Sequence, residues 1–204
     1  ELSQIRPAYY YALQRYNRAL QQRGRLLREG ALETLDVWDE QLAAAGAQII
    51  AHSRAFLQRL DEAAAGIHLD VSGGREHLRV AYQVGAKVQE ASDGELKQAL
   101  LRALLAARDV DARRMTTSAG PHRDDLLLEL DGMEVRAYGS QGQQRTCALS
   151  LKLSELQVMR DETGEWPVLM LDDVMSELDP HRRRHLLGRL EGVQTLVTCT
   201  DMDD

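Results

Sequence analysis

The sequence predicts an α/β protein in which a helical arm precedes a domain built on a parallel sheet. Residues 1–63 carry apolar side chains at intervals of three, four and seven, which is the period of helices. Beyond about residue 111, short apolar strands alternate with helical segments, an order typical of parallel sheets. We therefore divide the chain into an arm over residues 1–110 and an α/β domain over residues 111–204.

The first part of the arm reads as two long helices. The first apolar seam consists of Tyr9, Leu13, Tyr16, Leu20 and Leu27, and the second of Leu35, Trp38, Leu42, Ala45, Ile49, Phe56 and Ala63. Glu29 and Gly30 interrupt the pattern between them. We expect the two helices to fold back as an antiparallel hairpin with their seams facing each other.

The rest of the arm is predicted to hold a β-hairpin and a third helix. The segments IHLDVSG and HLRVAYQV alternate apolar and polar residues around Ser72–Gly73–Gly74, which is typical of a hairpin. Ser92 and Glu95 have the spacing of a capping box at the start of the following helix. The expected buried stripe of that helix consists of Leu96, Leu100, Leu101, Leu104 and Leu105.

The second half supplies the elements of the sheet. The strands DLLLEL and MEVRAY flank Asp131–Gly132, and a helix is expected over about residues 141–161. The strand VLML, a helix over about residues 181–190 and the strand QTLVTC complete the chain. Strand, helix and strand in this order predict parallel pairing, with the chemistry at the carboxyl ends of the strands.

Charge is spread unevenly along the chain. A formal charge of -7 argues against a uniformly basic protein that coats DNA. Residues 1–28, however, contain one acid, Glu1, beside the arginines Arg6, Arg15, Arg18, Arg23, Arg25 and Arg28, and Arg182–Arg184 form a second cluster. Either cluster could bind phosphate or could simply be a solvated helix face.

Other composition features exclude several classes of protein. Cys147 and Cys199 lack the spacing of a zinc site or a disulfide framework, so we expect small buried thiols. No apolar run approaches the length of a membrane span, and the first residues do not resemble a secretory signal. A cytoplasmic location is therefore expected. With aromatic residues at 4%, a broad base-stacking platform for single strands is not expected.

Two carboxylates end the strand VLML. Asp172 and Asp173 follow the apolar run of residues 168–171, and a buried parallel strand delivers such groups to a cleft. Asp172 could hold the magnesium of a nucleotide, and Asp173 could orient or deprotonate an attacking water. The alternative is an ordinary strand end followed by a capping aspartate.

Two further motifs favour the nucleotide interpretation. Residues 176–179, SELD, follow Asp173 at the spacing that separates Walker B from the D-loop in ABC ATPases. Upstream, Gly139–Arg145 at the start of a helix resembles the ABC signature. A serine hydroxyl, a glycine and free N–H groups at a helix N-terminus suit a γ-phosphate, although Ser140 alone could be only an N-cap. The chain thus resembles the C-terminal lobe of an ABC-type ATPase domain.

The form of these motifs resembles one family in particular. GPHRDD at residues 120–125, SQGQQR at 140–145 and LDDVMSELD at 171–179 are similar to the RecF family of SMC-like ABC ATPases. The resemblance covers roughly residues 111–203. It implies a cytoplasmic protein that binds DNA, as duplex and at gapped or single-strand junctions. It also implies a homodimer formed on ATP that works with RecO and RecR to load the recombinase at gaps.

The resemblance also assigns roles to residues. Ser140, Gln141, Gly142 and Gln143 would contact ATP in trans, and Asp179 would connect the two sites across the dimer. Asp172 would bind Mg²⁺ and Asp173 would position water. Arg15, Arg18 and Arg25 are the candidate DNA contacts. His122 and Arg123 either contact nucleotide or DNA, or form a turn in which Arg123 pairs with an acid.

Some features depart from the pattern. No G-x-x-x-x-G-K-[ST] phosphate loop occurs in these residues, so this fragment alone is expected to be inactive. Asp173 is shorter than the glutamate of most ABC ATPases, which predicts slow hydrolysis. The switch histidine of transporters has no counterpart, since its position falls at Cys199 or Thr200.

Three alternatives stay open. The chain could be a catalytically inert module that binds DNA or a partner, or part of another SMC-like ABC ATPase. A transporter subunit is disfavoured, because the stretch from Ser140 to Asp172 is longer than transporters usually show and no membrane-coupling segment is evident.

Overall fold

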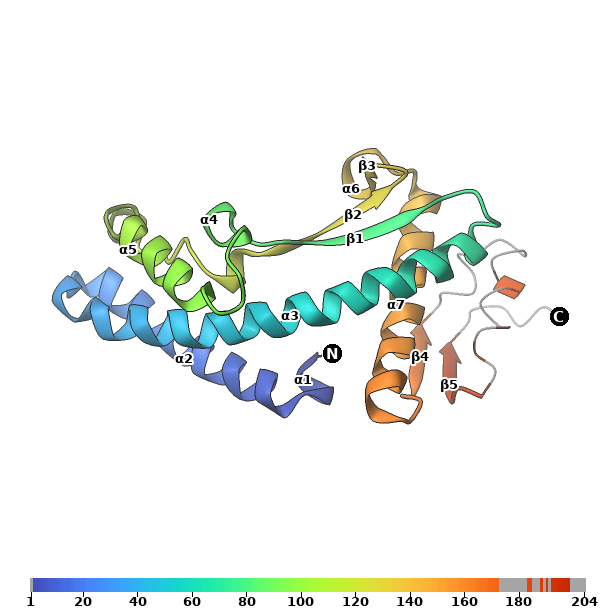
Figure 1. Cartoon of the computed structure of the whole chain (residues 1–204), viewed down its shortest axis with the longest axis horizontal. Helices are drawn as coiled ribbons and strands as arrows, with labels where there is room; N and C mark the ends of the chain where they lie inside the picture. Colours follow the sequence, from blue (N-terminus) through green and yellow to red (C-terminus); the bar gives the residue numbers. More distant parts are fainter. Residues whose placement is uncertain (1, 173–182, 185–187, 189, 191, 199–204) are drawn as a thin grey trace. The chain divides into compact units, whose positions relative to one another are not determined.

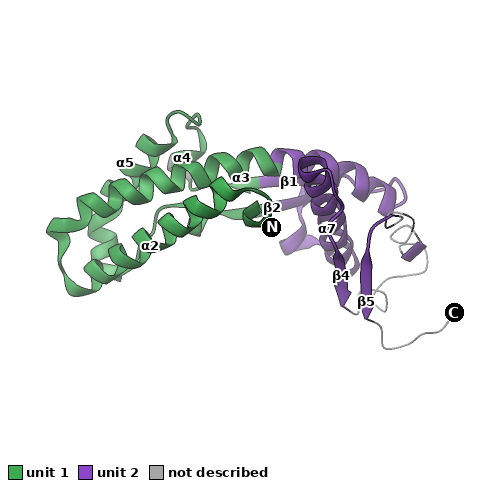
Figure 2. Cartoon of the chain, turned by 90° about the horizontal axis from the view of Figure 1, so that it is seen from below, with its two compact units in different colours: residues 1–57, 82–126 green, residues 58–81, 127–204 purple. Residues whose placement is uncertain are grey.

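The computed structural model describes residues 2–172, 183–184, 188, 190 and 192–198 (Figure 1). The side chains of Ala86 and Lys87 are not described. The chain forms two compact units (Figure 2). Unit 1 consists of residues 1–57 and 82–126, and unit 2 of residues 58–81 and 127–204.

The division into units crosses the predicted boundary at residue 110. The long helix α3, Leu35–Val71, begins in unit 1 and ends in unit 2, so one helix belongs to both. Each compact unit is therefore built from two segments that are separated in the sequence. The division into an arm and an ATPase part stays a prediction.

The first helices of unit 1 begin and end at the signals that the sequence contains. After the short helix α1, Leu2–Ile5, helix α2 spans Pro7–Glu29 and has proline in its first turn. Gly30 follows with φ 72° and donates its N–H to the Leu26 carbonyl, which is a left-handed helix C-cap. A 3-10 turn, Leu32–Thr34, leads into α3. The predicted break at Glu29 and Gly30 is confirmed.

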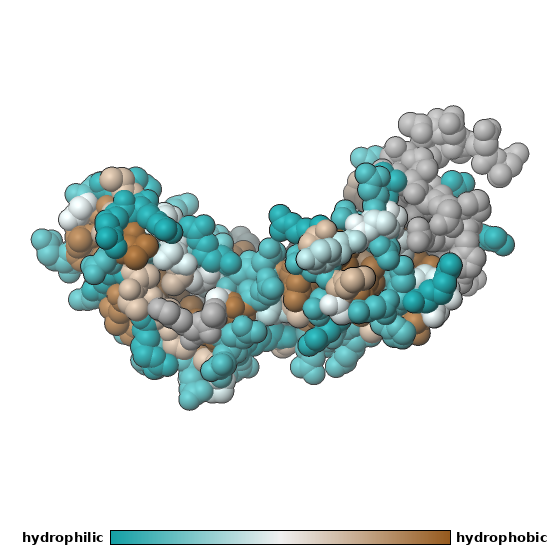
Figure 3. Space-filling view, turned by 90° about the horizontal axis from the view of Figure 1, so that it is seen from above, coloured by the Kyte–Doolittle hydropathy of each residue, from teal (hydrophilic) through white to brown (hydrophobic). Residues whose placement is uncertain are grey.

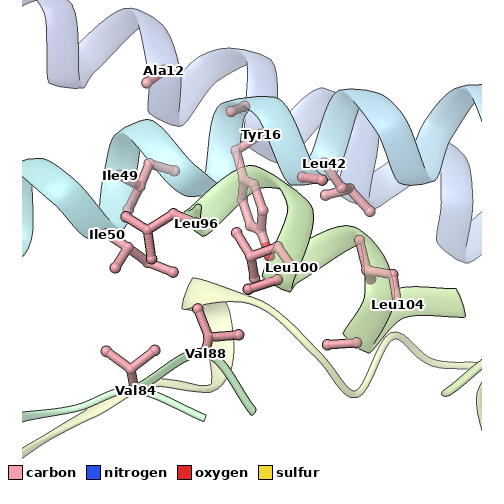
Figure 4. Close-up of a cluster of buried hydrophobic side chains, with 14 of the residues drawn as sticks. Ala12, Tyr16, Leu42, Ile49, Ile50, Val84, Val88, Leu96, Leu100 and Leu104 are labelled. Carbon is pink, nitrogen blue, oxygen red and sulfur yellow. The ribbon is translucent and has the colours of Figure 1, made fainter. Parts of the chain in front are cut away.

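The core of unit 1 is shared by α2, α3 and α5, Leu96–Arg114 (Figure 4). Its largest aromatic member is Tyr16, which is 2% exposed. Gly46 lets α3 pack closely against its neighbours, because a Cβ there would lie 3.1 Å from Leu100, 3.2 Å from Tyr16 and 3.3 Å from Pro121. The side chains of the predicted seams Tyr16, Leu42 and Ile49 are buried together with Leu96, Leu100 and Leu104.

The predicted hairpin at residues 67–84 is wrong in its first strand. IHLDV forms the last turns of α3, whose end is capped by Gly73 and Gly74, both with positive φ. The Gly74 N–H reaches the Leu69 carbonyl at 2.7 Å, a bond typical of a helix C-terminus. The two glycines therefore end a helix here. The second predicted strand is confirmed as β1, Leu78–Gln83.

The third predicted helix differs in two details. After the short α4, Ala86–Gln89, helix α5 begins at Leu96, and its N-cap is Glu95 with no side-chain cap. Ser92 donates its hydroxyl and N–H to the Glu95 carboxylate before the helix starts, and these bonds lower the pKa of Glu95. Leu105, predicted to be buried, is 44% exposed. The stripe is therefore narrower than predicted.

A three-stranded sheet has the order β1-β2-β3. After the 3-10 turn Pro121–Arg123, strand β2, Asp125–Leu130, pairs antiparallel with β3, Met133–Glu134. Asp131 and Gly132 between them have φ of 50° and 82°, as a two-residue hairpin of the I′ kind requires. The predicted strand MEVRAY is wrong beyond Glu134, because Val135–Tyr138 forms the helical turn α6.

Unit 2 also contains a small parallel sheet beside a long helix. Strand β4, Leu169–Asp172, pairs in parallel with β5, Thr195–Thr198, as predicted. Helix α7, Gln141–Thr163, contributes Leu149, Leu153 and Leu156 to a core that also contains the strand residues Leu169 and Leu171. The helix predicted over residues 181–190 lies outside the described residues for most of its length.

The surface is mixed in character. Hydrophilic side chains dominate the face in Figure 3, and hydrophobic ones are interspersed among them. None of the described helices combines the length and the apolar character needed to cross a lipid bilayer. Cys147 is buried, as predicted, and burial raises the pKa of its thiol to about 12. Cys199 lies outside the described residues.

Candidate functional site

The predicted signature lies at the N-terminus of α7. Ser140 is the N-cap: its hydroxyl accepts the Gln143 N–H at 3.3 Å, and the Gln143 side-chain oxygen accepts the Ser140 N–H at 2.9 Å. This reciprocal capping box leaves the N–H groups of Gln141 and Gly142 without an intrahelical acceptor. Ser140 and Gln141 are exposed. The helix therefore presents free donors and the positive end of its dipole to solvent.

A polar chain holds this helix start from behind. The Gln143 amide nitrogen donates to Glu76 Oε1 at 3.0 Å, and Glu76 Oε2 lies 3.3 Å from His68 Nε2. His68 Nδ1 lies 3.0 Å from the Ser150 hydroxyl, and both His68 and Ser150 are 0% exposed. The chain of contacts, Gln143–Glu76–His68–Ser150, links the signature to the end of α3. We call it the Glu76 relay.

Asp172 stands at the carboxyl edge of the parallel sheet. Its neighbours in the sequence alternate, with Leu169 and Leu171 buried and Met170 and Asp172 exposed. The Thr198 hydroxyl, at the same edge of the paired strand, donates to Asp172 Oδ1. The carboxylate is thus oriented where a parallel sheet normally carries its ligands. Asp173 and Asp179 lie outside the described residues.

The predicted motif at residues 120–125 forms a tightly engaged turn in unit 1. Gly120 has φ 126°, and a Cβ there would lie 2.2 Å from the Tyr16 hydroxyl, so glycine is required. His122 Nδ1 lies 2.6 Å from that hydroxyl, and His122 Nε2 lies 3.0 Å from the Thr117 carbonyl. Both ring nitrogens are therefore used within the fold.

Arg123 and Asp124 complete the turn. Arg123 donates to the Thr117 carbonyl and the Thr116 hydroxyl, so within the described residues its partners are oxygens of neutral groups. The turn that the sequence offered as an alternative is therefore present, but without the pairing of Arg123 with an acid. Asp124 accepts from the Tyr82 hydroxyl at 2.7 Å and from the Gly85 N–H at 3.2 Å. Burial lowers the pKa of His122 and raises that of Asp124. These contacts favour the structural interpretation of His122 and Arg123.

The candidate DNA-binding arginines fall into two groups. Arg15 donates to the Gln48 side chain at 2.7 Å, and it lines a groove together with Arg18. Arg25 is instead paired with Glu29 at 2.7 Å on the exposed face of α2, and this contact raises the pKa of Arg25. All three are exposed. Two of the three therefore share one surface feature.

One arginine of the basic cluster is not on the surface. Arg23 is 0% exposed and donates to Asp39 at 2.6 Å, to Asp111 at 2.7 Å and to Thr117 at 2.8 Å. A signal was present in the sequence, because Arg23 falls between Tyr16, Leu20 and Leu27 on the apolar seam. Glu76 and His68 were missed for another reason: they are eight residues apart, and only the end of α3 brings them together.

Comparisons with known proteins agree with this reading. No protein-family model matches the chain. The DNA replication and repair protein RecF of Alkaliphilus oremlandii is 45% identical over 206 residues, covering 100% of this chain and 56% of that protein. RecF of Acetivibrio thermocellus is 44% identical over 208 residues, covering 99% of this chain and 56% of that protein. The chain thus spans little more than half the length of these relatives.

Solved structures match over the same extent. A structure of the recombination mediator protein RecF-ATP in the RecFOR pathway superposes with a TM-score of 0.87 at 37% identity, over 100% of this chain and 56% of that one. A structure of RecF-ATPrS superposes with a TM-score of 0.85, over 97% of this chain and 54% of that one.

The fold and the motifs define the class: an α/β protein with the C-terminal lobe of an ABC-type ATPase domain and a helical arm. Within that class, both relatives described above are RecF proteins. Over its whole length the chain is similar to RecF proteins, and it corresponds to little more than half of their length.

Proposed function

We propose that the protein containing this chain is a cytoplasmic, ATP-dependent DNA-binding clamp of recombinational repair. It dimerises on ATP and helps to load the recombinase at gapped DNA together with RecO and RecR. The observation that carries the proposal is the whole-chain likeness to RecF, at 45% identity to one relative and a TM-score of 0.87 to a RecF-ATP structure.

In this proposal the start of α7 acts in trans. Two subunits sandwich ATP, and the signature residues Ser140, Gln141, Gly142 and Gln143 of one subunit bind the γ-phosphate of the nucleotide held by the other. Free N–H groups at a helix N-terminus suit that anion, and the capping box that fixes them supports the assignment. Asp179 connects the two nucleotide sites.

Asp172 is the proposed ligand of Mg²⁺. Magnesium is commonly bound through one or two carboxylates together with waters and substrate phosphates, so a single oriented carboxylate at a sheet edge fits this ion. The described residues contain no group of three or more His, Cys, Asp or Glu that could form an all-protein site. Bound magnesium neutralises charge on the phosphates. Asp173 positions the attacking water, and hydrolysis is slow.

ATP-dependent dimerisation of the full-length protein tests this proposal. Light scattering with and without ATP, and with and without DNA, should show a monomer that becomes a dimer when ATP is added. ATP then acts mainly as an assembly ligand, because a ligand that binds the dimer more tightly than the monomer stabilises the dimer by mass action. A protein that stays monomeric at saturating ATP would contradict the clamp.

Three substitutions separate the proposed roles. Asp172→Asn should weaken Mg²⁺-dependent ATP binding and prevent dimerisation, whereas Asp173→Asn should leave a long-lived ATP dimer. Ser140→Arg should bind ATP as a monomer and fail to dimerise, because a bulky cation occupies the place of the partner's γ-phosphate. Identical behaviour of the two aspartate variants would contradict the assignment.

The isolated fragment and the arm give two further checks. Calorimetry should detect at most weak ATP binding by residues 1–204 alone, since the signature contacts only the far side of a nucleotide held elsewhere.

In the full-length protein, reversing Arg15, Arg18 and Arg25 to glutamate should weaken duplex binding and flatten its salt dependence, by a slope of about 0.9 for each lost phosphate contact. ATP binding should survive.

A further inference from the structure

A groove in unit 1 holds two of the arginines of the proposed DNA-binding function beside an aromatic side chain. Arg15 and Arg18 of α2 line it with Trp38, Gln41 and Gln48 of α3, and Ala44 and Ala45 complete its lining. Its volume is about 440 Å³, within the range of about 300–1,000 Å³ typical of small-ligand sites. No carboxylate belongs to the described residues that line it.

The charges in and around the groove favour an anion. Arg15 and Arg18 are three residues apart on a helix and therefore lie on neighbouring positions of one face. The acids of α3 on either side of Trp38 are engaged elsewhere. Asp36 pairs with Arg108, and Glu40 pairs with Lys97 at 2.8 Å. Asp39 pairs with Arg23 and Arg108 in the interior. The arginines of the groove therefore keep their positive charge uncompensated by these acids.

The arginines are also positioned differently. Arg15 donates one N–H to Gln48 at 2.7 Å, which fixes the guanidinium while leaving further donors for a ligand. Arg18 has neither a hydrogen bond nor an ion pair within the described part of the chain. A fixed donor beside an unengaged one is suited to the several oxygens of a phosphate group.

Trp38 adds a flat apolar surface to this anion site. It is partly buried against the core of unit 1, which holds the ring in place, and its exposed part lines the groove. Stacking on an aromatic ring and charge neutralisation by arginine are the contacts that proteins use for single-stranded nucleic acid. Bases inside a duplex present only their edges, so an unstacked base is needed to reach a ring face.

We propose that this groove binds one unpaired nucleotide of a nucleic-acid strand, with its phosphate on Arg15 and Arg18 and its base against Trp38. The inference rests on the proposed DNA-binding function and narrows it. One aromatic side chain can stack with one base. This fits a chain that has too few aromatic residues for a broad stacking platform. Arg25, paired with Glu29, lies outside the groove.

The test measures the affinity of the full-length protein for two probes at one fixed salt concentration. The first is a fluorescein-labelled thymidine 15-mer, and the second is a blunt DNA hairpin of similar charge, both read by anisotropy. Trp38→Leu should weaken binding of the 15-mer by about 5- to 100-fold, the range expected for loss of one base stack, and change hairpin binding less than about twofold.

Gln48→Glu is a second variant that does not disturb the core, because Gln48 is exposed. It turns the Arg15 contact into an ion pair and puts a negative charge in the groove, so 15-mer affinity should fall at least about fivefold. Arg28→Gln is the matched control: this exposed arginine of α2 lies outside the groove and should change 15-mer affinity less than about twofold.

The outcomes distinguish this inference from the proposed function. Unchanged 15-mer affinity in both Trp38→Leu and Gln48→Glu would overturn the inference, as would a wild-type protein that binds the hairpin but not the 15-mer; the proposed function would then stand. If the wild-type protein bound neither the 15-mer nor the hairpin, both the inference and the proposed DNA-binding function would be contradicted.

Two further outcomes would reassign the groove. Thymidine monophosphate that competes as well as the 15-mer, at equal nucleotide concentration, would make the groove a site for free nucleotide and overturn the commitment to a strand. Weaker binding of RecR or RecO by Gln48→Glu with unchanged 15-mer affinity would give the groove to a protein partner, which also overturns the inference.

Discussion

Two segments that each begin with glycine differ in what contacts their polar groups make. Gly120–Asp124 and Gly139–Gln143 each place polar side chains after a glycine, and each belongs to a motif that resembles RecF. In the first, which we call the 120–124 turn, the polar groups are turned inward against Tyr16, Thr117 and Tyr82. In the second, the start of α7 faces solvent and is held from behind by the Glu76 relay.

The difference shows that a family motif can mark either a structural or a ligand-facing segment. His122 and Asp124 already have hydrogen-bond partners within the protein, and these leave little capacity for a ligand. The N–H groups of Gln141 and Gly142 keep that capacity. Sequence resemblance gives both segments the same weight, and only the contacts separate them.

The largest expected effect is the loss of the buried cation behind the 120–124 turn. Arg23→Met removes a cation that pairs with both Asp39 and Asp111, each 0% exposed, and leaves Asp39 with Arg108 alone. It should lower the free energy of unfolding by about 3–5 kcal/mol. Urea unfolding followed by circular dichroism measures it. Arg28→Met, on the exposed side of the same helix, is the control and should cost less than about 0.5 kcal/mol.

The second effect concerns the glycine of the 120–124 turn. Gly120→Ala combines a positive φ with a contact at 2.2 Å to the Tyr16 hydroxyl, so it should lower the free energy of unfolding by about 2 kcal/mol or more. Adding Tyr16→Phe removes the hydroxyl and should recover part of that loss, which a double-mutant cycle measures. Purely additive effects would show that the side chains do not collide.

The third prediction examines the Glu76 relay. Glu76→Ala removes the acceptor that holds Gln143, so the start of α7 should be less well ordered and ATP-dependent dimerisation should weaken by about 5- to 10-fold, the equivalent of about 1 kcal/mol. ATP binding by the monomer should be unchanged. Glu62→Ala, on the exposed face of α3, should leave both unchanged. Equal loss of nucleotide affinity and dimerisation would point to general unfolding.

The smallest effect is a pH dependence of the 120–124 turn. Burial lowers the pKa of His122 below its ordinary value of 6.5, so below pH 6.5 the unfolded chain binds more protons than the folded one. The contribution of His122 to stability is therefore fully present above pH 6.5, and it falls as the pH drops from 6.5 toward the lower pKa of His122 in the folded protein. Protonation of His122 Nδ1 would also change this nitrogen from the acceptor of the Tyr16 hydroxyl into a donor.

The size of this effect should be less than about 1 kcal/mol, because a partly exposed group is screened by solvent. Thermal unfolding of the wild type and of His122→Gln between pH 7.5 and 5.5 isolates the contribution of this one histidine. The wild type should lose stability more steeply with acid than the variant. Parallel curves would remove His122 as the cause. Asp124, whose pKa burial raises, gives a slope of the opposite sign.

The sequence by itself determined the elements whose signals are local. The helices α2 and α7 and the break at Gly30 follow from apolar periodicity and from single capping residues. The strand ending in Asp172 was also evident, since a run of apolar residues followed by carboxylates has few other readings. Each of these signals acts between residues that are close in the chain, and a sequence displays such signals directly.

Only the tertiary structure decided the rest. Residues 67–71 alternate like a strand, yet Ile67 and Val71 are also one helical turn apart, and the burial of both on α3 settled between the two periods. In the sequence Arg23 belongs to the basic cluster of residues 1–28. In the structure it is buried and pairs with Asp39 and Asp111, which lie 16 and 88 positions away in the chain. The Tyr16–His122 contact spans 106 positions. Partners so distant leave no periodic trace, because only folding brings them within hydrogen-bond distance.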